Sequence, residues 1–180
     1  MSLLLFVDRI KNKITRSYRK AVFKEKIGCK HKNFQLIGRV NVVNTNITLG
    51  KNVMIYPDVM FHGDGPIILG DNITIGNGTV IYASKNGGVT IGSNTMVAAQ
   101  SYIIDADHGT KKDKLSREQE ITVEPVFIGE DVWIAANVTV TKGSKIHSGA
   151  VIGAKALVRG EIPENAIAVG IPAKVIKERS

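Results

Sequence analysis

The sequence has little of several residue types, and each shortage excludes a class of protein. The single cysteine, Cys29, cannot form a disulfide within the chain or supply a cysteine-rich metal site. No segment approaches the roughly 20 apolar residues of a membrane span. The apolar run 3–7 precedes the charged residues, and no small-residue cleavage site follows it. We therefore expect neither a membrane-spanning protein nor a secreted one.

Acidic residues are scarce in one part of the chain. Residues 1–32 contain ten Lys or Arg but only two acids, Asp8 and Glu25, whereas residues 33–180 contain fourteen basic and fourteen acidic side chains. The whole net charge of +8 therefore lies in the leader. Nucleic acid is not an expected partner, because the leader has few aromatic residues for base stacking and the body is neutral.

The leader has the pattern of an amphipathic helix. Ile10, Ile14, Tyr18 and Val22 recur every four residues among basic side chains. Such a helix either caps the first unit of the fold or lies on an anionic membrane surface. We expect residues 1–32 to form a basic helical segment and residues 33–180 to form a separate domain. The expected location is the cytoplasm, at the inner face of the membrane if the helix docks there.

What the sequence does contain is a six-residue repeat. Seventeen apolar residues follow this spacing in four runs: Ile37, Val43, Leu49, Ile55 and Phe61; Leu69, Ile75 and Ile81; Ile91, Val97 and Ile103; and Ile128, Ile134, Val140, Ile146, Ile152 and Val158. The next position is usually Gly or Ala, and a second apolar or small residue comes four positions after each member. One such unit cannot bury its apolar row alone, so the units must stack. The period predicts an all-β fold, a parallel β-helix of five to six coils.

Three interruptions of the repeat are informative. Phe61 to Leu69 exceeds the period by two residues, Ile81 to Ile91 exceeds it by four, and Ile103 to Ile128 leaves a polar loop at about 104–126. Long loops expelled from a regular scaffold are usually functional or disordered. The loop argues against the alternative of a non-catalytic scaffold.

Three motifs resemble those of a known family. Asp105-Ala106-Asp107-His108-Gly109, the segment 132–139 (VWIAANVT) and the segment 170–177 (GIPAKVIK), together with the repeat, resemble the hexapeptide-repeat acetyltransferases. Within that family, the chain is most similar to sugar and surface-polysaccharide O-acetyltransferases. The resemblance covers residues 37–179. It implies a left-handed β-helix with an extruded catalytic loop, acetyl-CoA as co-substrate, no metal, and a homotrimer with sites between subunits.

The reaction needs a base for the acceptor hydroxyl. Histidine, with a pKa near 6.5, can accept this proton and return it to the leaving thiolate. His108 lies on the excluded loop and matches the catalytic histidine of the family. Asp105 or Glu124 is a candidate to orient its ring. Cys29 lies far along the chain, so we expect direct attack in a ternary complex.

The resemblance also implies a cofactor site. The pantetheine arm of acetyl-CoA is expected along the last coils, where the small Ala136 and Ala154 permit close approach. Arg159, Lys174 and Lys177 match positions near the nucleotide phosphates, and each is otherwise a solvated surface charge. Trp133 matches a tryptophan beside the catalytic site, and its alternative is simple packing.

The acceptor is less clearly indicated. Tyr82-Ala83-Ser84 stands where galactoside and maltose enzymes have Tyr-Ala-Asn, so Ser84 and Tyr82 are expected acceptor contacts, with His62 at an earlier interruption. We expect O-acetylation of a polysaccharide or its precursor, and the alternative is N-acetylation of a nucleotide-linked amino sugar. A γ-class carbonic anhydrase would need three zinc-binding histidines. Here His31, His62, His108 and His147 are scattered.

Overall fold

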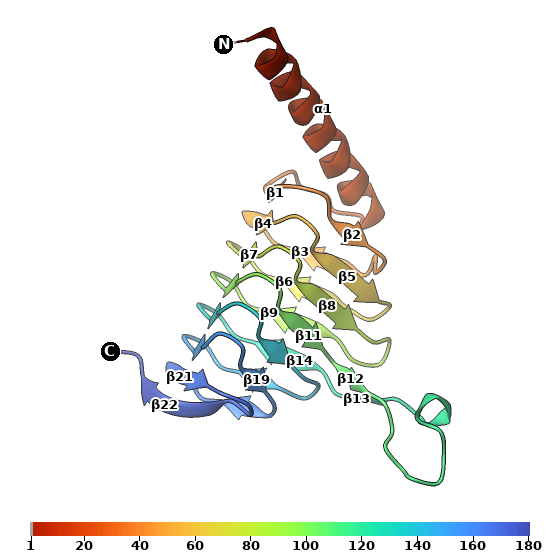
Figure 1. Ribbon diagram of the computed structural model, residues 1–180, viewed down its shortest axis with the longest axis vertical. Helices are drawn as coiled ribbons and strands as arrows, with labels where there is room; N and C mark the ends of the chain where they lie inside the picture. The colour runs from red at the N-terminus through yellow and green to blue at the C-terminus, as the bar shows by residue number, and fades with distance from the viewer. Residues whose placement is uncertain (1) are drawn as a thin grey trace.

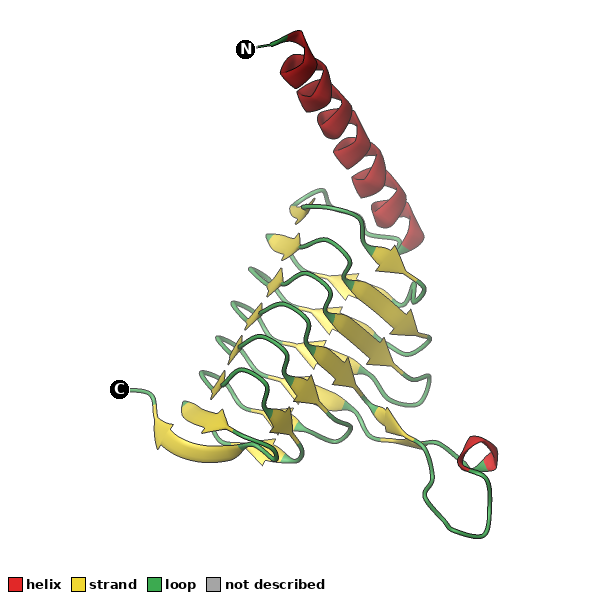
Figure 2. Cartoon of the chain, in the orientation of Figure 1, coloured by secondary structure: helices red, strands yellow, loops and turns green. Residues whose placement is uncertain are grey.

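A computed structural model describes residues 2–180 and confirms the predicted fold class. The chain winds into a three-sided parallel β-helix with one long N-terminal helix (Figures 1 and 2). Within residues 2–180, nineteen short parallel strands form three sheets, which we call the first, second and third sheet in the order in which the chain passes through them in each coil. The coil count exceeds the five to six expected, because the first sheet contains seven parallel strands.

The strands of each sheet come from successive coils. The first sheet consists of β1 (Phe34–Leu36), β4 (Val53–Ile55), β7 (Thr74–Ile75), β10 (Met96–Val97), β15 (Trp133–Ile134), β18 (Val151–Ile152), β21 (Ala166–Val169) and the antiparallel β22 (Lys174–Glu178). The second consists of β2 (Asn41–Val42), β5 (Met60–Gly63), β8 (Val80–Ala83), β11 (Tyr102–Ile104), β16 (Thr139–Val140) and β19 (Leu157–Val158). The third consists of β3 (Ile47–Leu49), β6 (Ile67–Leu69), β9 (Val89–Ile91), β14 (Val126–Ile128), β17 (Lys145–Ile146) and β20 (Glu161–Ile162).

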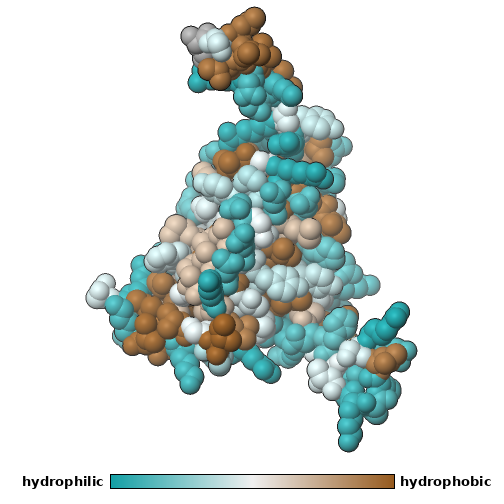
Figure 3. Space-filling view, viewed as in Figure 1, coloured by the Kyte–Doolittle hydropathy of each residue, from teal (hydrophilic) through white to brown (hydrophobic). Residues whose placement is uncertain are grey.

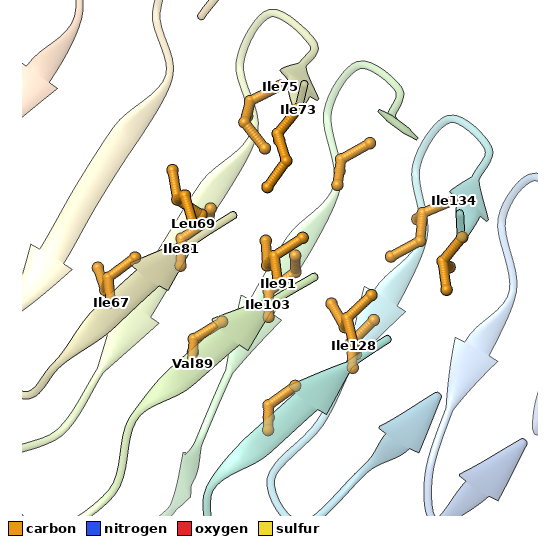
Figure 4. Packing of buried hydrophobic residues seen from close by; sticks show 14 of the residues in the cluster. Ile67, Leu69, Ile73, Ile75, Ile81, Val89, Ile91, Ile103, Ile128 and Ile134 are labelled. Atoms are coloured by element: carbon orange, nitrogen blue, oxygen red, sulfur yellow. The ribbon is translucent and has the colours of Figure 1, made fainter. Parts of the chain in front are cut away.

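The core is a set of apolar rows that run along the prism. Leu69, Ile91 and Ile128 stack in register on the third sheet, and Ile81 stacks on Ile103 on the second (Figure 4). All five side chains are buried. Each repeat therefore contributes to rows that only its neighbours can complete, as the six-residue period predicts.

Two of the repeat positions assigned from sequence are wrong. Ile37 and Val43 are 40% and 60% exposed, and the preceding residues Leu36 and Val42 occupy the row positions opposite Ile55 and Phe61. The cause is Asn44, a buried residue inserted at the next corner. Its Nδ2 donates to the carbonyl oxygens of His62 at 3.3 Å and Gly65 at 2.8 Å. This extra residue shifts the frame of the first coil by one.

Two corners of the prism have the same tight turn in successive coils. At the corner between the first and second sheets, Asn137 and Lys155 adopt left-handed backbone conformations. At the corner between the third and first sheets, Asn52, Asn72 and Asn94 do so, with φ of 58°, 58° and 63°. Asn52 Nδ2 donates to Asn72 Oδ1, and Asn72 Nδ2 donates to Asn94 Oδ1, both at 3.0 Å. Asparagine tolerates this conformation better than most residues. These turns have no room for extra residues.

The corner between the second and third sheets is different, and we call it the insertion corner. Across this corner, the number of positions from a core residue of the second sheet to the next core residue of the third sheet grows from coil to coil. It is seven from Val42 to Leu49, eight from Phe61 to Leu69, ten from Ile81 to Ile91 and twenty-five from Ile103 to Ile128. It then falls to six and four as the prism ends, so that Ile162 pairs with Ile146. Every departure from the period therefore lies along one edge of the prism.

The helix α1 (Leu3–Lys26) contacts the prism at its C-terminal end. Phe23 and the following Ile27 are buried in the core, and the Phe23 ring lies 5.5 Å from that of Phe34 and 6.3 Å from that of Phe61. The N-terminal half of α1 projects away from the first coil (Figure 1). No helix within residues 2–180 has both the length and the apolar character needed to cross a membrane.

We expect Phe23→Ala to lower the free energy of unfolding by about 3 kcal/mol, because it opens a cavity over the first coil. Urea-induced unfolding monitored by circular dichroism measures the change. The control is Tyr18→Ala, whose side chain on the same helix is 69% exposed and should change stability by less than about 0.5 kcal/mol. Equal effects for the two variants would contradict the role of Phe23 as a cap.

Candidate active site

His108 lies where the long loop leaves the insertion corner. The antiparallel strands β12 (Ala106–Asp107) and β13 (Thr122–Val123) form the narrow base of this loop, and His108 is the first residue beyond β12. Its side chain is exposed. Figure 1 shows this hairpin extending well beyond the body of the prism. The sequence predicted the loop but not the hairpin that fixes the exit point of His108.

The loop beyond His108 is held by one side chain. Gln119, which follows the short helix η1 (Ser116–Glu118), accepts the backbone N–H of Lys111 at 2.8 Å and donates to the carbonyl oxygens of Lys111 at 2.8 Å and Lys114 at 2.9 Å. The amide therefore closes the loop into a defined shape on one side of His108.

An open pocket of about 760 Å³ surrounds the imidazole. Its basic lining residues are Lys111, Lys114, Lys142 and Arg159, and its acidic ones are Asp107, Glu118 and Glu120. Arg159 was predicted to bind the cofactor, and it shares this pocket with His108. Lys111, Lys114 and Lys142 were not singled out from the sequence. The available signal for Lys142 was its position two residues after the row residue Val140, at the insertion corner.

Asp105 has a different environment from the one that ring orientation requires. The carboxylate is buried and accepts the backbone N–H of Ser84 at 2.8 and 2.9 Å and that of Gly88 at 2.7 Å. These bonds connect the start of the long loop to the 84–88 turn of the preceding coil. Within residues 2–180, the hydrogen bonds of Asp105 do not include one to His108.

Glu124, the other candidate to orient the ring, directly follows β13, where the chain returns from the loop. It forms an ion pair with Lys142, and its side chain is largely exposed. The pair crosses the base of the loop and connects it to the next coil. In the described part of the chain, the ion pair of Glu124 is therefore with Lys142 rather than His108.

The three expected acceptor residues lie together at the insertion corner. His62 and Tyr82 pair in register on adjacent coils, and their rings stack with centroids 5.1 Å apart at 19°. Ser84 follows two residues later, with its N–H bound to Asp105. His62 Nδ1 is buried and lacks a hydrogen-bond partner among the described residues. The pKa of nearby Tyr102 is raised, first by burial and then by the proximity of Tyr82.

The remaining cofactor candidates lie elsewhere on the chain. Trp133 is half-exposed on the first sheet, in register with Val151. Lys174 and Lys177 lie on β22 at the C-terminal edge of this sheet. Ala136 and Ala154 lie on adjacent coils at the corner between the first and second sheets, where Lys155 N–H donates to the carbonyl oxygen of Ala136 at 2.9 Å. Within a single chain, these residues therefore lie on a different part of the prism from His108 and Arg159.

No group of three His, Cys, Asp or Glu side chains within residues 2–180 is arranged to hold a metal ion. His31, for example, makes its Nε2 contact at 2.8 Å with the carbonyl oxygen of Leu49. His147 contacts Glu161 at 2.6 Å.

Comparison with family models gives two matches. The model described as "Bacterial transferase hexapeptide (six repeats)" matches residues 125–160, and "Hexapeptide repeat of succinyl-transferase" matches residues 46–83. Both segments belong to the parallel coils.

Two curated relatives from Escherichia coli (strain K12) extend the match. "Putative lipopolysaccharide biosynthesis O-acetyl transferase WbbJ" is 37% identical over 124 residues, covering 64% of this chain and 62% of that protein. "Putative colanic acid biosynthesis acetyltransferase WcaF" is 35% identical over 131 residues, covering 73% of this chain and 69% of that protein. The matched region thus spans slightly less than two thirds of the first relative and slightly more than two thirds of the second.

Solved structures with a similar fold include that of an N-acyltransferase. AntD, an N-acyltransferase from Bacillus cereus in complex with dTDP and 3-hydroxybutyryl-CoA, superposes with a TM-score of 0.73 at 19% identity, covering 83% of this chain and 81% of that chain. At this level of identity, the similarity establishes the β-helix architecture.

A substitution of Asp105 distinguishes a structural role in the 84–88 turn from a role in orienting the His108 ring. We expect Asp105→Ala to lower the free energy of unfolding by about 2 kcal/mol, because it leaves the buried N–H groups of Ser84 and Gly88 unpaired. Hydrogen exchange of these amides should accelerate as well. The control is Asp113→Ala, which removes an exposed carboxylate from the loop. Unchanged stability and exchange in Asp105→Ala would contradict the structural role and favour ring orientation.

Proposed function

The chain belongs to the hexapeptide-repeat acetyltransferase family, and we propose that it transfers an acetyl group from acetyl-CoA to a sugar hydroxyl of a surface polysaccharide or its precursor. The observation that carries the proposal is the position of His108, at the exit of the β12–β13 hairpin and beside a pocket with several basic side chains. The polysaccharide assignment is supported by the names of two relatives, which refer to lipopolysaccharide biosynthesis and to colanic acid biosynthesis. The donor implies a cytoplasmic site of action.

In the proposed mechanism, His108 is the general base. Its free ring nitrogen accepts the hydroxyl proton as the acceptor oxygen attacks the thioester carbonyl carbon. A tetrahedral oxyanion forms, and a backbone N–H on a nearby coil is the proposed donor to it. The carbon–sulfur bond then breaks, and the imidazolium returns the proton to the thiolate. The products are the acetyl ester and the free thiol of CoA.

Glu124 is the better candidate to orient His108. Its exposed carboxylate is bound to Lys142 through a surface ion pair, which contributes little to stability and can be exchanged. Asp105 is bound to two buried backbone N–H groups. We assign Asp105 an indirect role, in which it positions the 84–88 turn and with it Ser84.

The acceptor is proposed to bind along the insertion corner, between His62 and His108. The stacked rings of His62 and Tyr82 offer an apolar face of the kind that packs against a sugar ring. The hydroxyl of Ser84, two residues after Tyr82, supplies a polar contact for a sugar hydroxyl.

Acetyl-CoA is proposed to bind between two subunits of a homotrimer. His108 and Arg159 lie at one edge of the chain, whereas Trp133, Ala136, Ala154, Lys174 and Lys177 lie on the first sheet and at its corner with the second. A cofactor that touches both groups needs the second group from a neighbouring subunit. Closed homo-oligomers with shared sites are a common arrangement.

The alternative function is N-acetylation of a nucleotide-linked amino sugar. The fold similarity to an N-acyltransferase bound to dTDP favours it, and the same base and cofactor groove would serve. Thiol release from acetyl-CoA with matched hydroxyl and amino sugars distinguishes the two reactions. Mass spectrometry then identifies an ester or an amide. Stoichiometric zinc without acetyl-CoA binding would instead favour an anhydrase, and absence of saturable acetyl-CoA binding would favour a scaffold.

We expect His108→Ala to lower kcat by about 10²- to 10⁴-fold, because proton transfer to a positioned base contributes a factor of this size. Steady-state thiol release with a sugar acceptor measures the change, while acetyl-CoA binding should remain. The matched control is His147→Ala, which removes a half-exposed histidine outside the loop. Full activity in His108→Ala would refute the mechanism.

Subunit mixing tests the shared site. We expect His108→Ala and Ala154→Phe each to be nearly inactive, the second because a large ring blocks the cofactor groove. After denaturation, mixing in equal amounts and refolding, random assembly should restore about a quarter of the wild-type activity, since that fraction of sites receives both intact halves. Each variant refolded alone is the control. No recovery would indicate that each site is built within one chain.

A further inference from the structure

The basic face of helix α1, rather than its apolar face, contacts the β-helix. Its basic face turns toward the β-helix: Arg16 Nη2 donates to Gln35 Oε1 at 3.1 Å, and Lys20 Nζ donates to the carbonyl oxygen of Lys32 at 2.7 Å. The Lys20 ammonium also lies 4.8 Å from the centroid of the Phe34 ring. The face that contacts the protein is therefore the charged one, apart from Phe23.

The apolar face of α1 has no cover. Ile10, Ile14 and Tyr18 are 43%, 64% and 69% exposed, although they recur at the spacing of a buried stripe. A helix that only capped the first coil would turn this stripe inward. The cap described above involves only the last turn of α1 and Ile27.

The first residues of α1 are apolar on every side. Leu3–Val7 comprises five consecutive apolar residues, which cover more than one full turn, and Leu4 is 82% exposed. We call this segment the tip. Figure 3 shows it as a hydrophobic mass at the far end of the helix, separated from the prism by hydrophilic side chains. At 1.5 Å per residue the tip is about 7 Å long, a depth that interfacial helices typically reach in a monolayer.

Basic residues follow the tip directly. Arg9 and Lys13, four residues apart, lie on one side of the helix, and Lys11 lies on the opposite side, since each residue advances by about 100°. Grooves on both sides of α1 continue the positive charge, one lined by Arg9, Lys13, Arg16 and Arg19 and the other by Lys20, Lys24 and Lys32. The pKa of Lys20 is lowered, first by desolvation and then by the positive charges of Arg16 and Lys32.

Two occupants fit an uncovered apolar helix, and the tip distinguishes them. A second copy of α1 would cover a seam such as Val7, Ile10 and Ile14, and it would leave Leu4 and Leu5 in water. A bilayer covers all sides of the tip at once, and anionic headgroups complement the basic residues behind it. We propose that α1 docks this protein on an anionic membrane surface, with the tip in the acyl boundary and Arg9, Lys11 and Lys13 among the lipid phosphates.

Docking by α1 would hold the β-helix beneath the membrane surface without a spanning segment. An acceptor carried on a membrane lipid would then be concentrated near the insertion corner. The docking itself does not depend on the proposed acetyl transfer, and the two can fail separately.

Vesicle co-sedimentation of the full chain tests the tip. The wild type should bind vesicles of phosphatidylcholine and phosphatidylglycerol and bind pure phosphatidylcholine much more weakly. Leu4→Ser with Phe6→Ser should lower the partition coefficient at least about tenfold, because two apolar side chains no longer gain from burial. The control is Ile68→Ser with Phe127→Ser, which changes two exposed apolar residues on the third sheet, outside α1 and outside the proposed site. Thiol release with a water-soluble acceptor should be unchanged in both variants.

Charge placement is tested with two double variants that have the same net charge. Lys11→Glu with Lys13→Glu should abolish the preference for phosphatidylglycerol, whereas Lys51→Glu with Lys112→Glu should change binding less than about twofold. Added salt should weaken binding of the wild type. The proposal is overturned if the wild type does not sediment with anionic vesicles or if test and control variants behave alike. A tip variant that binds vesicles normally but forms a smaller assembly would instead assign the stripe to a second copy.

Discussion

The structure depends on one constraint, the in-register parallel stacking of coils. Each coil forms backbone hydrogen bonds with the coil before and after it, and its apolar residues complete rows begun by its neighbours. An extra residue within a strand would move the whole side-chain pattern from the core to the surface. Extra residues are therefore confined to corners, and two of the three corners are closed by tight turns with left-handed residues. The candidate site lies at the third corner because only this corner tolerates added length.

The sequence predicted the parts of the molecule that depend on periodicity. From Leu49 to Val158 the assigned row residues are all buried, and the long loop lies where the repeat breaks. The same reasoning failed in the first coil, where adjacent apolar residues at 36 and 37 and at 42 and 43 fit either frame. Only the burial of Asn44, through bonds to residues of the next coil, decides between them.

The six-residue pattern could not predict which side chains bind partners on neighbouring coils. Asp105 appears in the sequence as part of an acidic segment before His108, yet its carboxylate binds backbone groups about twenty residues earlier. The stacking of His62 on Tyr82 depends in the same way on register across an interruption. The i+4 pattern of α1 predicted an amphipathic helix, but a pattern contains no information on which face meets the rest of the protein. Contacts between distant residues determine all three features.

The two ends of the prism have a further consequence. A stack of parallel coils exposes unpaired backbone groups at each end, and such edges can pair with another molecule. Here Phe23 and Ile27 cover the first coil, and the antiparallel β22, with a register shift against β21 and several charged residues, follows the last. Among the described residues, both ends thus depart from the uniform three-strand edge on which the first coil of another molecule would stack. A repeat of this kind could in principle continue from one molecule to the next. Its termination at both ends opposes polymerisation of the protein into fibres.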